Sequence, residues 1–211
     1  MNTPFTTEQF FSIFEKYNHT VFPAQIILLL LGTFALMAIG LGLKHKDKFI
    51  TGILGLLWFW IGIGYHLTFF SEINKVAYGF GGLFIIQGLF FLYEGLVKNN
   101  LRFAFQHSFQ GYVAFFFILY GLVIYPIVGY LIEQNINHTI SLGLPCPTTI
   151  FTFGFLLLTD KWFSKKLLII PSLWAIIGIS AVINLGIYQD SMMLITAIIS
   201  DSWLFRRKSP S

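Results

Sequence analysis

The chain has 211 residues, of which 56% are hydrophobic and 10% are charged, and its net charge is +4. Soluble globular domains contain about 25% charged residues, so this composition excludes an ordinary soluble domain and is typical of a membrane protein. The length allows about seven spanning helices of roughly 20 residues each with short loops between them. We therefore expect a single membrane domain over residues 1–211.

The N-terminal segment, residues 5–18, is predicted to form a short amphipathic helix. Thr6 and Gln9 have the spacing of a capping box. Four aromatic residues recur at helical spacing on one side of this helix: Phe10, Phe11, Phe14 and Tyr17. Such a helix either lies in the membrane interface or packs as a cap on the bundle. Residues 1–22 lack the basic start and continuous apolar core of a signal peptide.

Seven apolar segments are predicted to cross the membrane, at about residues 23–43, 50–70, 76–97, 112–132, 140–158, 167–188 and 191–205. Two of them carry glycines seven residues apart, namely Gly55 and Gly62 in the second segment and Gly81, Gly88 and Gly95 in the third. Small residues on one stripe let helices approach closely in lipid. We therefore expect both stripes to face other helices.

The fifth segment is interrupted by Pro145 and Pro147, which flank Cys146, the only cysteine in the chain. Because proline fixes φ and has no N–H, the fold class is an all-α membrane bundle with its fifth helix broken at these prolines. We predict that the regular helix starts at Pro147, with Cys146 as its N-cap and Thr148 and Thr149 in its first turn. Free N–H groups and the helix dipole would stabilise a thiolate there.

The basic residues indicate an orientation. Eleven of the 13 lysines and arginines lie in alternate loops and in the C-terminal tail, and only Lys16 and Lys75 lie on the other side. By the positive-inside rule, the C-terminus is cytoplasmic and the N-terminus is outside. The positive charge thus follows the membrane surface, and no nucleic-acid partner is expected.

Polar residues that could form a binding site gather at the outer end of this topology. We expect an outward-facing site built from Tyr65, His66, Asn74, Cys146, Thr148, Thr149, Gln189 and Asp190. Irregular backbone at membrane depth needs cover from protein or from a water-filled cavity, which favours a site at the broken helix. Gln87, in the middle of the third segment, either makes one interhelical hydrogen bond or lines a solute path.

A thiolate and an imidazole together select soft metal ions, so Cys146 and His66 are candidate metal ligands. Each also has a structural interpretation. Cys146 can serve as a small buried hydrophobic residue, and His66 can be an interfacial side chain bonded to a carbonyl. No cofactor can be named from the sequence.

Three runs of the sequence carry a resemblance: Tyr65-His66, Gly143-x-Pro145-Cys146-Pro147-Thr148-Thr149 and Gln189-Asp190. With Asn74 and the segment around Pro171 and Trp174, they resemble a prokaryotic membrane-protein family that is described only as a domain of unknown function. The resemblance covers nearly the whole chain. It implies a multi-pass protein of a bacterial or archaeal cytoplasmic (inner) membrane, and it implies no activity.

The leading functional hypothesis is binding or transport of a small solute or metal ion from the outer face, by a protein surrounded by the lipid bilayer. The alternative is a non-catalytic accessory or assembly subunit that packs against a membrane-protein partner in a larger complex. A membrane-embedded enzyme, with Cys146 as nucleophile and His66 as base, is the third hypothesis. It is disfavoured because no complete catalytic set is visible in the sequence.

Overall fold

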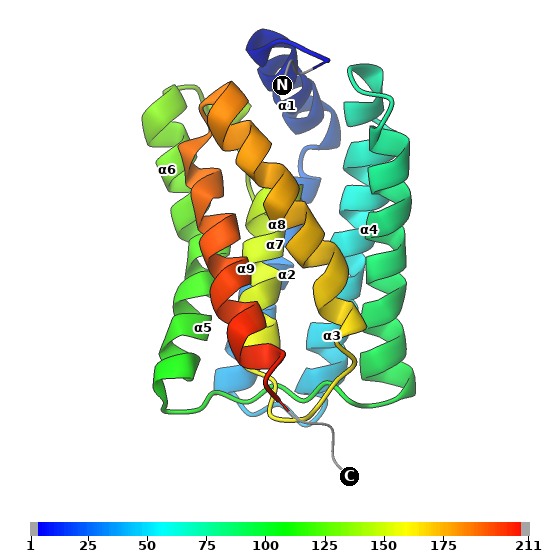
Figure 1. Cartoon of the computed structure of the whole chain (residues 1–211), viewed down its shortest axis with the longest axis vertical. Coiled ribbons are helices and arrows are strands. Elements are labelled where there is room, and N and C mark those ends of the chain that lie inside the picture. The colour runs from blue at the N-terminus through cyan, green and yellow to red at the C-terminus, as the bar shows by residue number, and fades with distance from the viewer. Residues whose placement is uncertain (1–3, 208–211) are drawn as a thin grey trace.

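A computed structural model describes residues 4–207 and has the form of a helix bundle (Figure 1). Its α-helices are α1 (Thr7–Val21), α2 (Ala24–Gly40), α3 (Lys46–Trp60), α4 (Ala77–Leu92), α5 (Phe109–Leu119), α6 (Tyr125–Glu133), α7 (Pro145–Leu157), α8 (Lys166–Leu185) and α9 (Ser191–Leu204). Shorter π and 3-10 segments extend or join them: η1 (Ile61–Leu67), η2 (Phe70–Glu72), η3 (Tyr93–Val97), η4 (Tyr120–Ile124), η5 (Ile136–His138) and η6 (Tyr188–Asp190). The described residues contain isolated β-bridges but no β-strand, so the all-α class is confirmed.

Four helical stretches among the described residues are long and apolar enough to cross a membrane: Lys46–Glu72, Ala77–Val97, Phe109–Glu133 and Lys166–Leu185. Helices α1 and α2 would add a fifth if they were counted as one span, although they are bent by 86°. Helices α7 and α9 have 13 and 14 residues. At 1.5 Å per residue they are about 20 Å long, shorter than a hydrocarbon core of roughly 30 Å. The seven spans and their orientation thus stay predictions.

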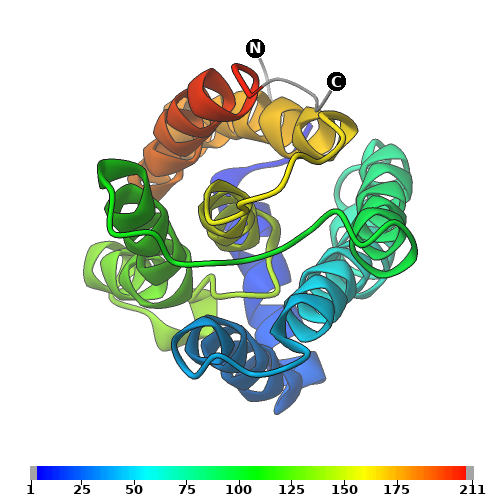
Figure 2. The same cartoon turned by 90° about the horizontal axis from the view of Figure 1, so that it is seen from below.

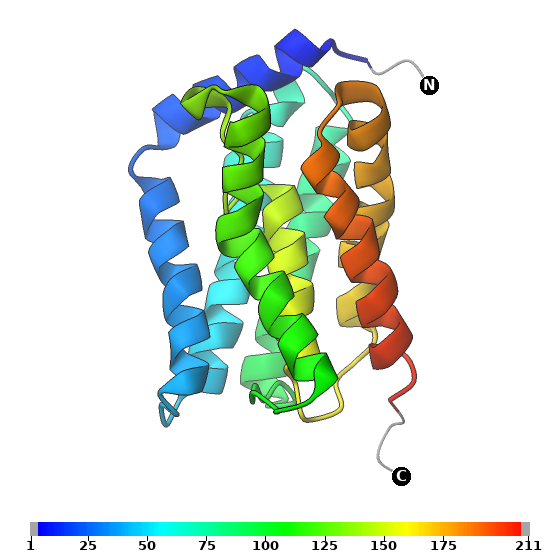
Figure 3. The ribbon, with the colours of Figure 1, turned by 90° about the vertical axis from the view of Figure 1, so that its left-hand side faces the viewer.

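Helix α1 lies across one end of the bundle, and α2 turns away from it to run along the bundle (Figure 3). The capping box predicted at its start is present. Thr6 Oγ1 accepts a hydrogen bond from the Gln9 N–H at 3.2 Å, and the Gln9 side chain accepts one from the Thr6 N–H at 2.9 Å. The buried face of α1 packs against η1, where the Phe14 ring stacks on Tyr65 with 5.8 Å between centroids. Helix α1 therefore covers this end of the bundle.

Helix α7 lies in the centre of the bundle and is surrounded by the longer helices (Figure 2). Of its 13 residues, 12 are buried. One link to its surroundings is a hydrogen bond from the Trp58 indole N–H of α3 to Thr152 Oγ1, at 3.0 Å, between two side chains with no exposed surface. A helix that is apolar on all sides, as α7 is, is stable only when it is enclosed in this way.

The chain enters the bundle as irregular backbone over residues 139–144 and becomes helical at Pro145. Leu144 is the N-cap of α7, so the predicted helix start at Pro147 with Cys146 as N-cap is wrong by two residues. The physical reason is that the first turn of a helix needs no intrahelical N–H. Both prolines fit in that turn, one at the first position and one at the third.

The glycine stripes of α3, η1 and α4 face each other, as predicted. A Cβ added to Gly62 would lie 2.9 Å from the Gly81 carbonyl oxygen, and one added to Gly88 would lie 3.0 Å from the Gly55 carbonyl oxygen. These distances are shorter than an ordinary contact, so only glycine lets the two helices approach so closely.

The two ends of the bundle differ in charge. The connections over residues 41–45, 98–108 and 158–165 lie at the same end of the bundle as the end of α9 (Figure 1). Ten of the 12 lysines and arginines among residues 4–207 lie in these connections, in the first turns of α3 and α8, or directly after α9. Helix α1 covers the opposite end. There Lys16 forms an ion pair with Glu72, with 2.7 Å between Nζ and Oε1.

Candidate functional site

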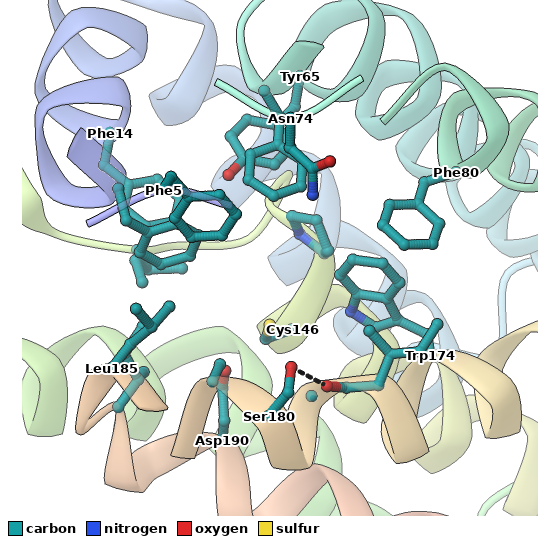
Figure 4. A pocket seen from close by; sticks show the side chains of 18 of the residues that line it. Phe5, Phe14, Tyr65, Asn74, Phe80, Cys146, Trp174, Ser180, Leu185 and Asp190 are labelled. Carbon is teal, nitrogen blue, oxygen red and sulfur yellow. Dashed lines mark hydrogen bonds between the residues drawn. The ribbon is translucent and has the colours of Figure 1, made fainter. Parts of the chain in front are cut away.

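A cavity of about 220 Å³ lies between the N-terminal end of α7, helix α1 and helix α8, and we call it the chamber (Figure 4). Its wall is largely aromatic and is formed by Phe5, Phe10, Phe14, Tyr65, Phe70, Phe80 and Trp174. These rings come from segments far apart in the sequence. Helix α1 therefore forms part of the chamber wall, together with helices that are distant from it in the sequence.

The floor of the chamber is the first turn of α7, where Pro145 and Cys146 line the cavity. An ordinary helix start offers four N–H groups without an intrahelical partner. Pro145 and Pro147 have no N–H, and the Thr148 N–H already donates to the Leu144 carbonyl at 3.3 Å. Only the Cys146 N–H is left in this turn. The several N–H groups that were expected to stabilise a thiolate are therefore not available.

Thr148 and Thr149 are fully buried, and their hydroxyl groups are bonded to backbone. Thr148 Oγ1 accepts a hydrogen bond from the Gly143 N–H at 3.0 Å, and Thr149 Oγ1 donates to the Pro145 carbonyl at 2.8 Å. Gly143 has a φ of +99°, a left-handed conformation that favours glycine. The two threonines thus fix the turn that leads into α7, and neither lines the chamber.

Asp190 supplies the one acidic group among the described residues that line the chamber. It lies in the 3-10 turn between α8 and α9 and is only 2% exposed. Tyr125 of α6 donates its hydroxyl to Asp190 Oδ1, and the Cys146 thiol lies next to the carboxyl group. Burial raises the pKa of Asp190 from 3.8 to about 7, against the opposing effect of these two neighbours.

The structure brings four of the predicted site residues to this cavity: Tyr65, Asn74, Cys146 and Asp190. His66 lies behind the aromatic wall and is fully buried. Its ring contacts Trp174 and Phe84, with centroid distances of 5.2 and 4.7 Å. Neither ring nitrogen has a hydrogen-bond partner among the described residues, so the carbonyl bond of its structural interpretation is not made.

Gln87 and Gln189 lie outside the chamber lining. Gln87 Nε2 donates to the Leu167 carbonyl of α8 at 2.9 Å, which is the interhelical hydrogen bond named as one of its two interpretations. Gln189 is 5% exposed, and its backbone carbonyl accepts a hydrogen bond from the Tyr120 hydroxyl at 3.3 Å. The Gln87 side chain thus joins α4 to α8, whereas Gln189 joins η6 to η4 through its backbone carbonyl.

Metal binding finds little support in this geometry. Within residues 4–207, no group of three or more histidine, cysteine, aspartate or glutamate residues is placed to hold a metal ion. Cys146 has Asp190 as its acidic neighbour, whereas His66 is enclosed by aromatic rings. The chamber thus offers apolar contact and one acidic group.

Comparison with known proteins places the chain in a family. The family of unknown function DUF6064 matches residues 7–209. The chain belongs to this family. The match covers every α-helix described above, and the family description names no activity.

The chain is also similar to sugar transport protein 4 of Arabidopsis thaliana, with 29% identity over 179 residues. The match covers 74% of this chain and 34% of that protein, so the DUF6064 chain spans about a third of the length of the curated relative it matches. No solved structure matches it.

The sequence did not single out two residues of the DUF6064 site: Tyr125, which bonds Asp190, and Trp174, which lines the chamber. Tyr125 comes from the middle of a long apolar stretch, where nothing marks it as the partner of Asp190. Trp174 was named from the sequence as part of the resemblance, yet its side chain lines the chamber and its indole nitrogen has no hydrogen-bond partner among the described residues. Its neighbours on α8 one and two turns later, Gly178 and Ala181, are small and leave room beside it. That pattern of a tryptophan followed by small residues was the available signal.

The free energy of unfolding of the DUF6064 protein is expected to fall as the pH rises from about 4 to about 7, because Asp190 is protonated more readily in the folded than in the unfolded state. The stabilisation is fully present below the unfolded pKa and is lost as the pH rises through the folded pKa. Asp190→Asn should remove this part of the pH dependence. Thermal unfolding in detergent at about pH 5 and about pH 8 measures it.

The matched control is Asp160→Asn, because Asp160 forms an ion pair with exposed Arg102 at 3.3 Å, at the opposite end of the bundle. This variant should retain the fall in stability between the two pH values. An Asp190→Asn protein with the same fall as the unchanged protein would contradict the assignment.

Proposed function

We propose that this DUF6064 protein is a membrane protein that binds a small, mostly apolar molecule in the chamber above α7. The observation that carries the proposal is the chamber itself, an aromatic cavity with few polar groups on its surface. Ligand sites are concave and mostly apolar, with a small number of polar groups that fix the orientation of the ligand. The chamber has this character.

The size of the chamber suits a molecule with one ring. A cavity of about 150 Å³ accommodates benzene. At about 220 Å³, the chamber has room for a ring with a short polar substituent, and it is too small for a whole phospholipid. The aromatic side chains of the wall can make edge and face contacts with the ring of the ligand. These contacts add to the binding free energy that comes from burying apolar area.

The structure of α7 favours binding over an open passage. Beneath the chamber, α7 fills the axis of the bundle with large buried side chains such as Phe151, Phe153 and Phe155. A solute in the chamber would therefore reach the opposite end only after α7 moves. The chamber is the site at which such a solute would be held.

We also propose seven membrane crossings, with the α1 end outside. The basic connections and the end of α9 with Arg206 and Arg207 share one end of the bundle, which supports a cytoplasmic location for that end. Helices α7 and α9 are short, but α7 is enclosed by the other helices. The irregular residues 139–144 extend its path through protein. The chamber would then lie toward the outer face.

Sugar transport is the second candidate, and the similarity to sugar transport protein 4 favours it. A sugar carries several hydroxyl groups that need hydrogen-bond partners when they are buried. The polar side chains of the chamber are few, and the Ser180 hydroxyl already donates to the Ile177 carbonyl at 2.7 Å. The composition of the wall therefore favours the apolar ligand.

Labelling of Cys146 tests the proposal, because this residue lines the chamber and is the only cysteine in the chain. The neutral reagent N-ethylmaleimide should label it in the folded protein reconstituted in nanodiscs. 4-Methylbenzyl alcohol, a ring with one polar group, should slow the labelling in a saturable manner, and glucose should not. The reaction is followed by the mass of the intact protein.

The control is Cys146→Ser combined with Ser202→Cys, which moves the thiol to an exposed position on α9. Labelling of this thiol should be unaffected by the alcohol. Protection by glucose in place of the alcohol would favour the sugar candidate. Equal labelling of Cys146 with and without the alcohol would count against binding in the chamber.

A further inference from the structure

The chamber combines a carboxyl group with an aromatic wall, and this pairing bears on the charge of its ligand. Among residues 4–207, those that line the chamber include Asp190 and no lysine, arginine or histidine. The ion pairs formed among residues 4–207 do not include Asp190. A carboxylate buried without a cation is costly, and such a group is normally paired or bound to a ligand of opposite charge.

The groups that face Asp190 cannot supply this positive charge. They are three phenols and one thiol, from η1, η4, α6 and α7: Tyr65, Tyr120, Tyr125 and Cys146. The Tyr125 hydroxyl donates one hydrogen bond to the carboxyl group. The Cys146 thiol lies beside the same carboxyl group, and Asp190 lines the chamber.

The aromatic wall is suited to a positive charge. The faces of tryptophan, tyrosine and phenylalanine attract a cation within about 6 Å of the ring centre, and the attraction grows when the site is shielded from water. Phe80 and Trp174 pack together on the wall with their centroids 5.3 Å apart, and Tyr65 is connected to them through the His66 ring behind the wall. A cation in the chamber would thus contact ring faces while it approaches the carboxylate.

An anion would be poorly received in the same place. The start of α7 is the positive end of a helix dipole, but its two prolines leave a single N–H for an anion there. An anion in the chamber would be repelled by the Asp190 carboxylate and would find no basic side chain among the described residues that line it.

We infer that the ligand of the chamber is a small organic cation, an ammonium group on an apolar body, with Asp190 as its counter-ion and the aromatic wall around it. The inference rests on the proposed function, because it names the class of molecule that the chamber takes. Binding exchanges a proton for the ligand. When the empty chamber holds Asp190 in its protonated form, the carboxyl group releases its proton to solvent as the ammonium group enters.

The proton exchange fixes the direction of the pH dependence. Burial places the pKa of Asp190 at about 7 in the empty chamber. Above that pH the carboxylate is already ionised and binding is independent of pH. Below it, each unit of pH should weaken the binding of the cation by about tenfold, while a neutral ligand of the same shape should be unaffected.

A pair of ligands of nearly equal shape tests the inference: 4-methylbenzylamine, which is a cation at neutral pH, and 4-methylbenzyl alcohol, which is neutral. Binding of each to the protein in nanodiscs is measured at about pH 8 and about pH 6. At the higher pH the amine should bind about tenfold more tightly than the alcohol or better. This advantage should shrink at the lower pH and disappear in Asp190→Asn. The alcohol should bind Asp190→Asn and the unchanged protein alike.

The outcomes separate the two proposals. If the alcohol binds as tightly as the amine at both pH values, the inferred cation is wrong and the proposed apolar site stands. If neither ligand binds the unchanged protein, the proposed function itself fails. If Asp190→Asn does not fold, the pH dependence of amine binding to the unchanged protein decides: a constant ratio of amine to alcohol affinity overturns the inference. Asp160→Asn, outside the chamber, should leave every affinity unchanged.

Discussion

Replacing Gly154 by alanine is expected to destabilise the protein by about 1–3 kcal/mol. Gly154 lies on the central helix α7, against α5. A Cβ at this position would lie 2.8 Å from the Ala114 carbonyl oxygen and 2.9 Å from the Ile118 nitrogen. Both are backbone atoms and cannot rotate away, so α7 and α5 must separate. Since α7 is buried on all sides, the separation disturbs its packing against the other helices as well.

The matched control is Gly82→Ala on α4, where an added Cβ has no atom within 4 Å. In a helix, alanine at an unhindered position is more stable than glycine by roughly 0.5–1 kcal/mol. The two substitutions make the same chemical change and should shift the midpoint of thermal unfolding in detergent in opposite directions. Equal shifts would mean that α7 is not packed against α5 as described.

Features that depend on neighbouring residues could be predicted from the sequence. The capping box at Thr6 needs only its partner three residues later. The glycine stripes are visible as a seven-residue spacing, and helices in lipid bring such stripes together. The prolines in the fifth segment forbid a continuous helix, although the sequence predicted the start of α7 two residues too late. Each of these features follows from local chemistry.

The chamber could be predicted only in part, because it is made by contacts between distant segments. Cys146 and Asp190 were selected as polar residues at the same end of the bundle. The hydrogen bond that joins Asp190 to Tyr125 spans 65 positions in the sequence, and no spacing reveals it. His66 and Thr148 were selected by the same reasoning and lie outside the cavity. Residue type alone does not tell which side of a buried helix a polar group occupies.

The second large effect is expected at Ala181, which lines the chamber from α8. A tryptophan at this position would fill the space that the ligand needs. The ligand would then have to displace a large side chain that is already packed against aromatic rings, so we expect Ala181→Trp to abolish binding. Ile176→Trp on the same helix is the control, because Ile176 is 58% exposed on the outside of the bundle.

Equilibrium binding of 4-methylbenzyl alcohol to the protein in nanodiscs is the most direct measurement of whether the chamber is a ligand site. Empty nanodiscs provide the correction for partition into lipid. The chamber predicts saturable binding to one site in the unchanged protein and in Ile176→Trp, and no saturable binding in Ala181→Trp. Saturable binding of equal strength in all three proteins, or in none of them, would contradict it.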